Sequence, residues 1–208
     1  MKVYPLPVGG YQTNCYILSV EKRAVIVDPG DDANKIVAYL ETNGLVPEAV
    51  LITHGHFDHL GALEQIQEKY PVDVYIHQDE KGCLTNPELN LSHQPGRGGI
   101  SIKDLSRLQV IEEEGVIELL GEKIQTLHVP GHTVGSVVFY VLEAGFAIVG
   151  DVLFKSSIGR TDFPNGNHDQ LIAGIKSKLM TLPEETIVYT GHGEATLIGT
   201  EKRNNPFL

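Results

Sequence analysis

The feature that most constrains this chain is the segment Thr53–His59, whose sequence is THGHFDH. It follows the apolar run AVLIT at Ala49–Thr53, which is typical of a buried strand. An extended backbone projects alternate positions to one side, and three of the four polar candidates in this segment alternate. The fourth stands at the start of a predicted helix. The candidate metal ligands here are His54, His56, Asp58 and His59.

Four ligands on one short loop exceed what a single tetrahedral ion accepts from one segment without strain, which favours two neighbouring ions. A His-rich solvated turn is the alternative interpretation. It is disfavoured because so many titratable groups gain nothing from clustering after a buried strand unless a cation compensates them.

Three later segments share one pattern, an apolar run that ends in a small-residue turn. They are VPGHT with His132, AIVGD with Asp151, and VYTGH with His192. The glycine before each polar residue permits a tight turn and the close approach of a ligand. Each segment alone is more typical of an ordinary turn. Together with the first segment they supply five His and two Asp, which suits a dinuclear site with one bridging carboxylate.

Strands and helices are expected in two blocks, which indicates an α/β class in which helices cover sheets, in a single domain, residues 1–208. Hairpin-like strand spacing argues against a purely parallel sheet. The tract Gly96–Gly99 is expected to be plain loop. Strands are expected at Val3–Pro7, Asn14–Val20, Ala24–Val27, Ala49–Thr53, Val72–Ile76, Val116–Leu120, Lys123–Val129, Ser136–Leu142, Phe146–Val149 and Thr186–Tyr189. Helices are expected at Ala33–Asn43, with an N-cap from Asp31-Asp32, at Leu60–Lys69 and around Asp169–Met180.

Charge and composition exclude several classes of binding partner. The formal net charge of −11 argues against a nucleic-acid partner. We find no apolar stretch of about 18 residues and no secretory signal, so we expect a cytoplasmic protein with no membrane partner. Two cysteines are too few for a disulfide framework, and Cys15 is expected to be a buried small residue. Three further histidines, His77, His93 and His168, are expected at the surface.

The order THxHxDH, GHT, GD and GH resembles the metallo-β-lactamase superfamily over nearly the whole chain. The resemblance implies a four-layer αβ/βα sandwich with metals at one edge between two sheets. It also implies that Asp28, in VIVDPG, braces the segment Thr53–His59, called the metal loop below. A turn-forming Asp before Pro is the other interpretation. The implied ligands are His54, His56 and His132 on one ion, Asp58, His59 and His192 on the second, and Asp151 between both.

Within that superfamily, LFKSSIGRTDFPNGN and the C-terminal GHGEATLIGTEKRNNPFL are similar to short, single-domain relatives of glyoxalase II, the hydroxyacylglutathione hydrolases. The long form has a C-terminal helical domain that helps to bind glutathione, and this chain is expected to lack it. Gly193-Glu194 stands where the long form has an aromatic residue. Arg160 is the candidate to pair with a substrate carboxylate, with a surface loop arginine as the alternative.

The resemblance implies a thioesterase that hydrolyses S-acylglutathione. Two divalent cations, with Zn favoured and Fe or Mn as alternatives, would lower the pKa of a shared water to about 7 and so supply hydroxide. Asp58 could take the proton from that water. A thiolate leaves readily, because an ordinary thiol has a pKa near about 8.5.

Other chemistries stay open. A mononuclear iron persulfide dioxygenase of the superfamily shares the stretch GRTDF, Gly159–Phe163, and would use a facial triad from among His54, His132 and Asp151. A phosphodiesterase is disfavoured by the charge, and a β-lactamase by the lack of an export signal. A non-catalytic metal-binding protein is disfavoured because all seven ligand positions are filled.

Overall fold

The computed structural model describes residues 1–93, 95 and 99–208, which form two compact units, Met1–Ile111 and Glu112–Leu208. The expectation of plain loop at Gly96–Gly99 falls largely on residues 96–98, which lie outside the described residues.

The first unit contains a six-stranded mixed sheet in the order β1-β2-β3-β4-β5-β6. The first three strands are antiparallel neighbours, and the pairs from β3 to β6 are parallel. The carboxyl ends of β3, β4 and β5 therefore meet at one edge of the sheet, where ligands bind in open α/β sheets. The strands are β1 (Lys2–Val8), β2 (Thr13–Val20), β3 (Arg23–Val27), β4 (Val46–Leu51), β5 (Asp73–His77) and β6 (Leu108–Ile111).

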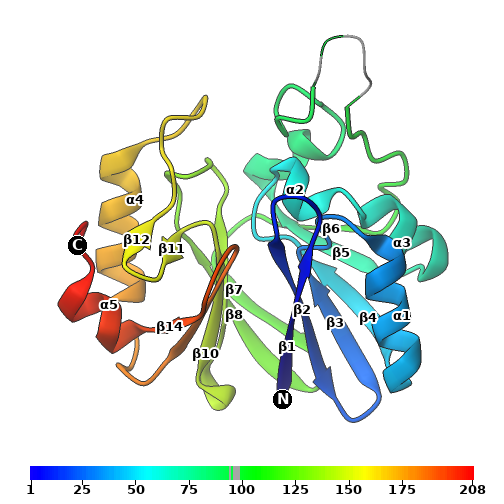
Figure 1. Ribbon diagram of the computed structural model, residues 1–208, viewed down its shortest axis with the longest axis horizontal. Helices are drawn as coiled ribbons and strands as arrows, with labels where there is room; N and C mark the ends of the chain where they lie inside the picture. Colours follow the sequence, from blue (N-terminus) through cyan, green and yellow to red (C-terminus); the bar gives the residue numbers. More distant parts are fainter. Residues whose placement is uncertain (94, 96–98) are drawn as a thin grey trace. The chain divides into compact units, whose positions relative to one another are not determined.

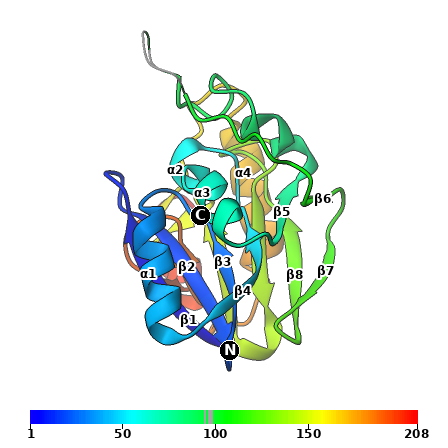
Figure 2. The same ribbon diagram turned by 90° about the vertical axis from the view of Figure 1, so that its right-hand side faces the viewer.

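Figures 1 and 2 both show the helices α1 (Ala33–Asn43) and α3 (Leu63–Lys69) along the same face of this sheet. Helix α1 has the expected bounds, and its C-cap Gly44 is left-handed. Its expected N-cap is wrong in one respect: Asp32 makes no side-chain cap bond, because its carboxylate accepts the amide of Gly9 instead.

The expected helix Leu60–Lys69 is two helices, α2 (Phe57–Leu60) and α3. The amide of Ala62, in the break, donates to the Pro29 carbonyl at 2.9 Å, so a tertiary contact interrupts the run. A 3₁₀ helix, η1 (Gln78–Leu84), follows β5. The core of the unit lies between the sheet and these helices and includes Ile36, Leu40 and Leu63.

The second unit contains a six-stranded sheet in the order β14-β13-β10-β9-β8-β7 and a small sheet, β11-β12. The elements are β7 (Gly115–Leu119), β8 (Glu122–His128), β9 (Val137–Val141), η2 (Leu142–Ala144), β10 (Phe146–Gly150), β11 (Leu153–Phe154), β12 (Ser157–Ile158), α4 (His168–Gly174), the π-helix η3 (Ile175–Leu179), β13 (Ile187–Thr190), β14 (Thr196–Leu197) and α5 (Ile198–Asn204). Figure 1 shows α4 and α5 along one side of the larger sheet.

The α/β fold class is confirmed, because each unit pairs a mixed sheet with its own helices. Five short elements were not predicted from the sequence: the strands β6, β11, β12 and β14 and the helix α5. Within the described part of the chain, every helix is too short or too polar to cross a bilayer.

Candidate metal centre

The first set of predicted ligands follows the carboxyl end of β4. Asp28 follows the neighbouring parallel strand β3, and the pairing of Val27 with Leu51 places Asp28 beside the start of the His-rich loop. The amide of Asp28 donates to the Leu51 carbonyl at 3.0 Å. The residue has a left-handed backbone, with φ 50°, which Asp tolerates better than most side chains.

Asp28 holds the loop through three hydrogen bonds, although it is almost fully buried. Its Oδ1 accepts the amide of Thr53 at 2.8 Å. Its Oδ2 accepts the Thr53 hydroxyl at 2.6 Å and faces His59 Nδ1 at 2.9 Å. A carboxylate that accepts from three donors of the loop is a rigid anchor for it.

These contacts determine the tautomers. Because the Thr53 hydroxyl donates to Asp28, its oxygen accepts from His54 Nδ1, which lies 3.1 Å away. His59 donates from Nδ1 to the Asp28 carboxylate. In the neutral form, both His54 and His59 then carry their lone pair on Nε2, the state that a metal ion needs.

The side chains of this loop converge. His54 Nε2 lies 3.1 Å from His56 Nδ1, and the rings of His54 and His59 lie 4.1 Å apart between centroids. His59 Nε2 lies 3.8 Å from the Asp58 carboxylate. All three histidines are buried. Three buried imidazoles and a carboxylate at these distances form a donor set that fits a divalent cation.

A cavity of about 200 Å³ lies beside Asp58 and is lined partly by Tyr11, Phe57 and Ile100. The rings of Tyr11 and Phe57 meet edge to face, with centroids 5.2 Å apart. Thr13, which is 1% exposed, donates its hydroxyl to Asp58 Oδ2 at 3.0 Å. The cavity therefore combines an apolar wall with a candidate ligand whose carboxylate is already oriented.

The second set of predicted ligands lies in the second unit. His132, Asp151 and His192 follow β8, β10 and β13, which all run in the same direction. The amide of Gly191 donates to the Gly150 carbonyl at 2.7 Å, which places the two following ligands side by side.

Asp151 lies between the two histidines. Its Oδ2 is 3.8 Å from His132 Nε2 and 3.5 Å from His192 Nε2. His132 donates from Nδ1 to the carbonyl of Arg160 at 2.8 Å, so its Nε2 carries the lone pair. Gly159 fits closely under this group, because a Cβ there would lie 1.8 Å from the Asp151 carbonyl oxygen.

The Arg160 side chain forms an ion pair with a neighbouring acid. Its guanidinium binds the Asp162 carboxylate in two-point geometry, with Nε–Oδ1 at 3.0 Å and Nη2–Oδ2 at 2.8 Å. It also lies 4.4 Å over the Phe163 ring. This pair raises the pKa of Arg160 and lowers the pKa of Asp162. The substrate role of Arg160 stays a prediction, and a substrate carboxylate would compete with Asp162.

No sequence signal indicated Thr13, Thr53 or Glu80, because hydroxyls and isolated acids carry no motif of their own. The Glu80 carboxylate accepts the amide of Gly55, between His54 and His56, at 2.7 Å. The prediction that His77 lies at the surface is wrong. It ends β5, is buried, and accepts the amide of Asp79 at 3.3 Å as the N-cap of η1. His93 and His168 are exposed, as expected, and Cys15 is fully buried.

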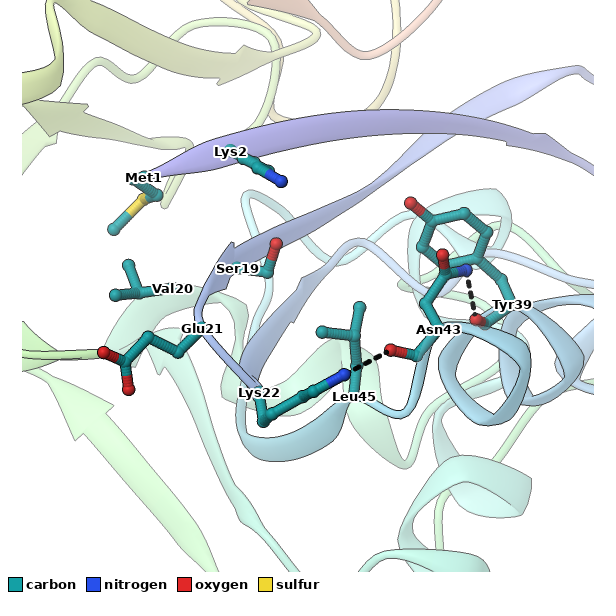
Figure 3. A pocket seen from close by; sticks show the side chains of 9 residues that line it. All are labelled: Met1, Lys2, Ser19, Val20, Glu21, Lys22, Tyr39, Asn43 and Leu45. Atoms are coloured by element: carbon teal, nitrogen blue, oxygen red, sulfur yellow. Dashed lines mark hydrogen bonds between the residues drawn. The ribbon is translucent and has the colours of Figure 1, made fainter.

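A larger cavity, about 470 Å³, lies at the other end of β1 and β2 (Figure 3). Its lining includes Lys2, Lys22 and Tyr39, and the Lys22 amino group points toward the Asn43 carbonyl at 3.5 Å. None of the seven predicted ligands is among its lining residues.

A comparison with family models matches residues 8–192 to the metallo-beta-lactamase superfamily. The chain belongs to this superfamily. All seven predicted ligands lie within the matched residues. The relatives include a probable metallo-hydrolase YqgX of Bacillus subtilis, 44% identical over all of this chain and 98% of the relative. Hydroxyacylglutathione hydrolase GloC of Haemophilus influenzae is 38% identical over all of this chain and 98% of the relative.

Solved structures of the superfamily match nearly the whole chain. BLEG-1 B3 metallo-beta-lactamase is 40% identical, with a TM-score of 0.93 over 99% of each chain. TTHA1623 in a di-iron-bound form is 38% identical, with a TM-score of 0.87 over 99% of this chain and 100% of that one. The fold and the metallo-hydrolase class of this chain rest on these matches together.

Proposed function

We propose that the chain is a dinuclear metal-dependent thioesterase that hydrolyses S-acylglutathione or a similar small thioester, and that residues 1–208 work as a single domain. The two ligand sets would bind one pair of divalent cations. His54, His56 and His132 would hold one ion, Asp58, His59 and His192 the other, and Asp151 both. The observation that carries this proposal is the position of the Asp151 carboxylate between the Nε2 atoms of His132 and His192. The Nε2 atom of His132 carries its lone pair, because the Nδ1 atom donates to the Arg160 carbonyl.

Bound divalent cations would supply a water that ionises near neutral pH and an electrophile for the acyl oxygen. The residues of the chain supply the positioning. Asp28 and Thr53 hold the rings of His54 and His59 in one tautomer, and the Arg160 carbonyl does so for His132. Asp58 would accept the proton of the attacking water, with Thr13 fixing one of its oxygens.

The size of the cavity beside Asp58 favours a substrate with a small acyl group. Its volume is about 200 Å³. It is smaller than the pockets that enclose drug-sized ligands, which begin near ~300 Å³. The cavity would admit a short hydroxyacyl group while the thiol part stays outside. The similarity to GloC supports the same substrate class.

The experiment joins elemental analysis to three assays on one sample of purified protein. We expect two equivalents of metal, zinc or iron, and turnover of S-lactoylglutathione. Absence of thioester hydrolysis with two metals bound would refute the proposal. Hydrolysis of a chromogenic cephalosporin alone would instead favour the β-lactamase activity for which BLEG-1 B3 metallo-beta-lactamase is named. One iron with oxygen uptake on glutathione persulfide would favour the dioxygenase.

A further inference from the structure

Glu80 is a buried carboxylate that the proposed chemistry does not use. It lies in the first turn of η1, and it is 1% exposed. Acidic side chains are almost never fully buried unless they are paired. The Oε2 atom of Glu80 accepts the amide of Gly55 at 2.7 Å and the thiol of Cys83 at 3.6 Å. The acid is therefore committed to the main chain of the metal loop.

Gly55 stands between His54 and His56, and η1 packs directly on it. A Cβ at this position would lie 2.3 Å from Cys83 Cβ and 2.7 Å from Glu80 Oε2. No side chain larger than hydrogen fits without movement of the helix. The absence of a side chain at Gly55 lets the carboxylate reach the peptide N–H between the two candidate ligands.

A second amide of the same loop is held by Asn90, which follows η1 in the chain. The amide of Phe57 donates to the carbonyl of Asn90 at 2.9 Å. Asn90 is fully buried, and its side chain donates to the carbonyls of Cys83 at 2.7 Å and Ile100 at 2.9 Å. The amides of Gly55 and Phe57 alternate with the ligands along the chain. Holding alternate peptide planes fixes the Cα–Cβ directions of the residues between them.

We propose that Glu80 is a positioning residue for the metal centre. Its carboxylate fixes the peptide plane between His54 and His56, and so fixes the angle at which both rings meet the metal ion. This inference rests on the proposed function only in that these histidines bind metal. Removal of groups that orient metal ligands typically lowers metal affinity by about 10- to 100-fold.

The test measures metal affinity by competition with a chelator, and ligand geometry by the visible absorption spectrum of the cobalt-substituted protein. Glu80→Gln keeps an acceptor oxygen for the Gly55 amide. Its metal affinity should lie within about threefold of that of the unmodified protein, and its cobalt spectrum should be the same. Glu80→Met has a similar shape and no such acceptor. It should bind metal about 10- to 100-fold more weakly, with an altered spectrum.

Two further variants keep the test decisive. Glu80→Asp keeps the charge but shortens the side chain, so it should weaken metal binding even if Glu80→Met fails to fold. Asp79→Asn removes one charge from an exposed side chain of the same helix, which faces His77 and not the metal loop. It should leave both the metal affinity and the cobalt spectrum unchanged.

The inference is overturned if Glu80→Asp and Glu80→Met keep full affinity and spectrum, or if Glu80→Gln is as defective as they are. A failure of the proposed function would be distinguishable from a failure of this inference. It would show as two bound metals without thioester turnover in the unmodified protein, and it would leave these comparisons intact.

Discussion

Replacing Asp28 by Asn tests whether the metal loop is held by the fold itself. The carboxylate accepts three hydrogen bonds at 2.6 to 2.9 Å, two from Thr53 and one from His59, in a buried position. An amide side chain offers only one acceptor oxygen. In its best orientation the oxygen keeps the Thr53 hydroxyl and the His59 ring, and the amide NH₂ group then faces the Thr53 N–H.

That arrangement loses one buried hydrogen bond, which costs about 1–3 kcal/mol, and converts two charge-assisted bonds to neutral ones, at about 1 kcal/mol each. We expect Asp28→Asn to lower the free energy of unfolding of the metal-free protein by about 3 kcal/mol or more, measured by urea denaturation after metal removal. Asp31→Asn makes the same change at an exposed site three residues away and should cost less than about 1 kcal/mol. If Asp28→Asn lies within about 0.5 kcal/mol of the unmodified protein, the three-bond anchor is not a stabilising element.

Three further outcomes are expected. Burial, with the neighbouring acid as a second cause, raises the pKa of the Cys83 thiol to about 12. At pH 8 its alkylation by iodoacetamide, followed by mass spectrometry, should be about 50-fold slower than that of an exposed cysteine, since the higher nucleophilicity only partly offsets the small thiolate fraction; an ordinary rate would contradict this. Burial raises the pKa of Glu114, but hydrogen bonds from Lys178 and a backbone amide outweigh it and leave the pKa below its usual range. The ionised acid therefore stabilises the fold above about pH 4.3 and stops doing so as pH falls. Glu114→Gln should cost less than about 1 kcal/mol of unfolding free energy at pH 7 and a smaller amount at pH 3 in urea denaturation, and an equal cost at both would refute the assignment. Thr13→Val, which removes the donor to Asp58, should weaken metal binding about tenfold in chelator competition, whereas Thr13→Ser should not; equal affinities would exclude an orienting role.

The sequence predicted the elements whose information is local. Alternation of polar residues after an apolar strand indicated the loop at Thr53–His59, and the apolar period with a terminal glycine gave α1 its correct bounds. His77 was misplaced because its polar neighbours suggested a surface. It ends β5, an inner strand of the first sheet, and its side chain is buried.

The contacts that orient the candidate ligands could not be predicted, because they join residues far apart in sequence. Glu80 reaches Gly55 across 25 residues, and Thr13 reaches Asp58 across 45. Both depend on the strand order and register of the first sheet, since Thr13 begins β2 and Glu80 lies in the helix that follows β5. A single acid or hydroxyl has no periodicity, and only the assembled sheet distinguishes it from a solvated side chain.

The role of Arg160 separates into two parts that a substitution can distinguish. Its carbonyl fixes the tautomer of His132, and any L-residue at this position supplies the same carbonyl. Its guanidinium is held by Asp162 and by the face of Phe163, and it is well exposed. A side chain held on the surface in this way can exchange Asp162 for a substrate carboxylate at little cost, because exposed ion pairs are worth about 1 kcal/mol or less. The geometry thus places ligand orientation in the main chain of this segment and leaves its side chain available for specificity.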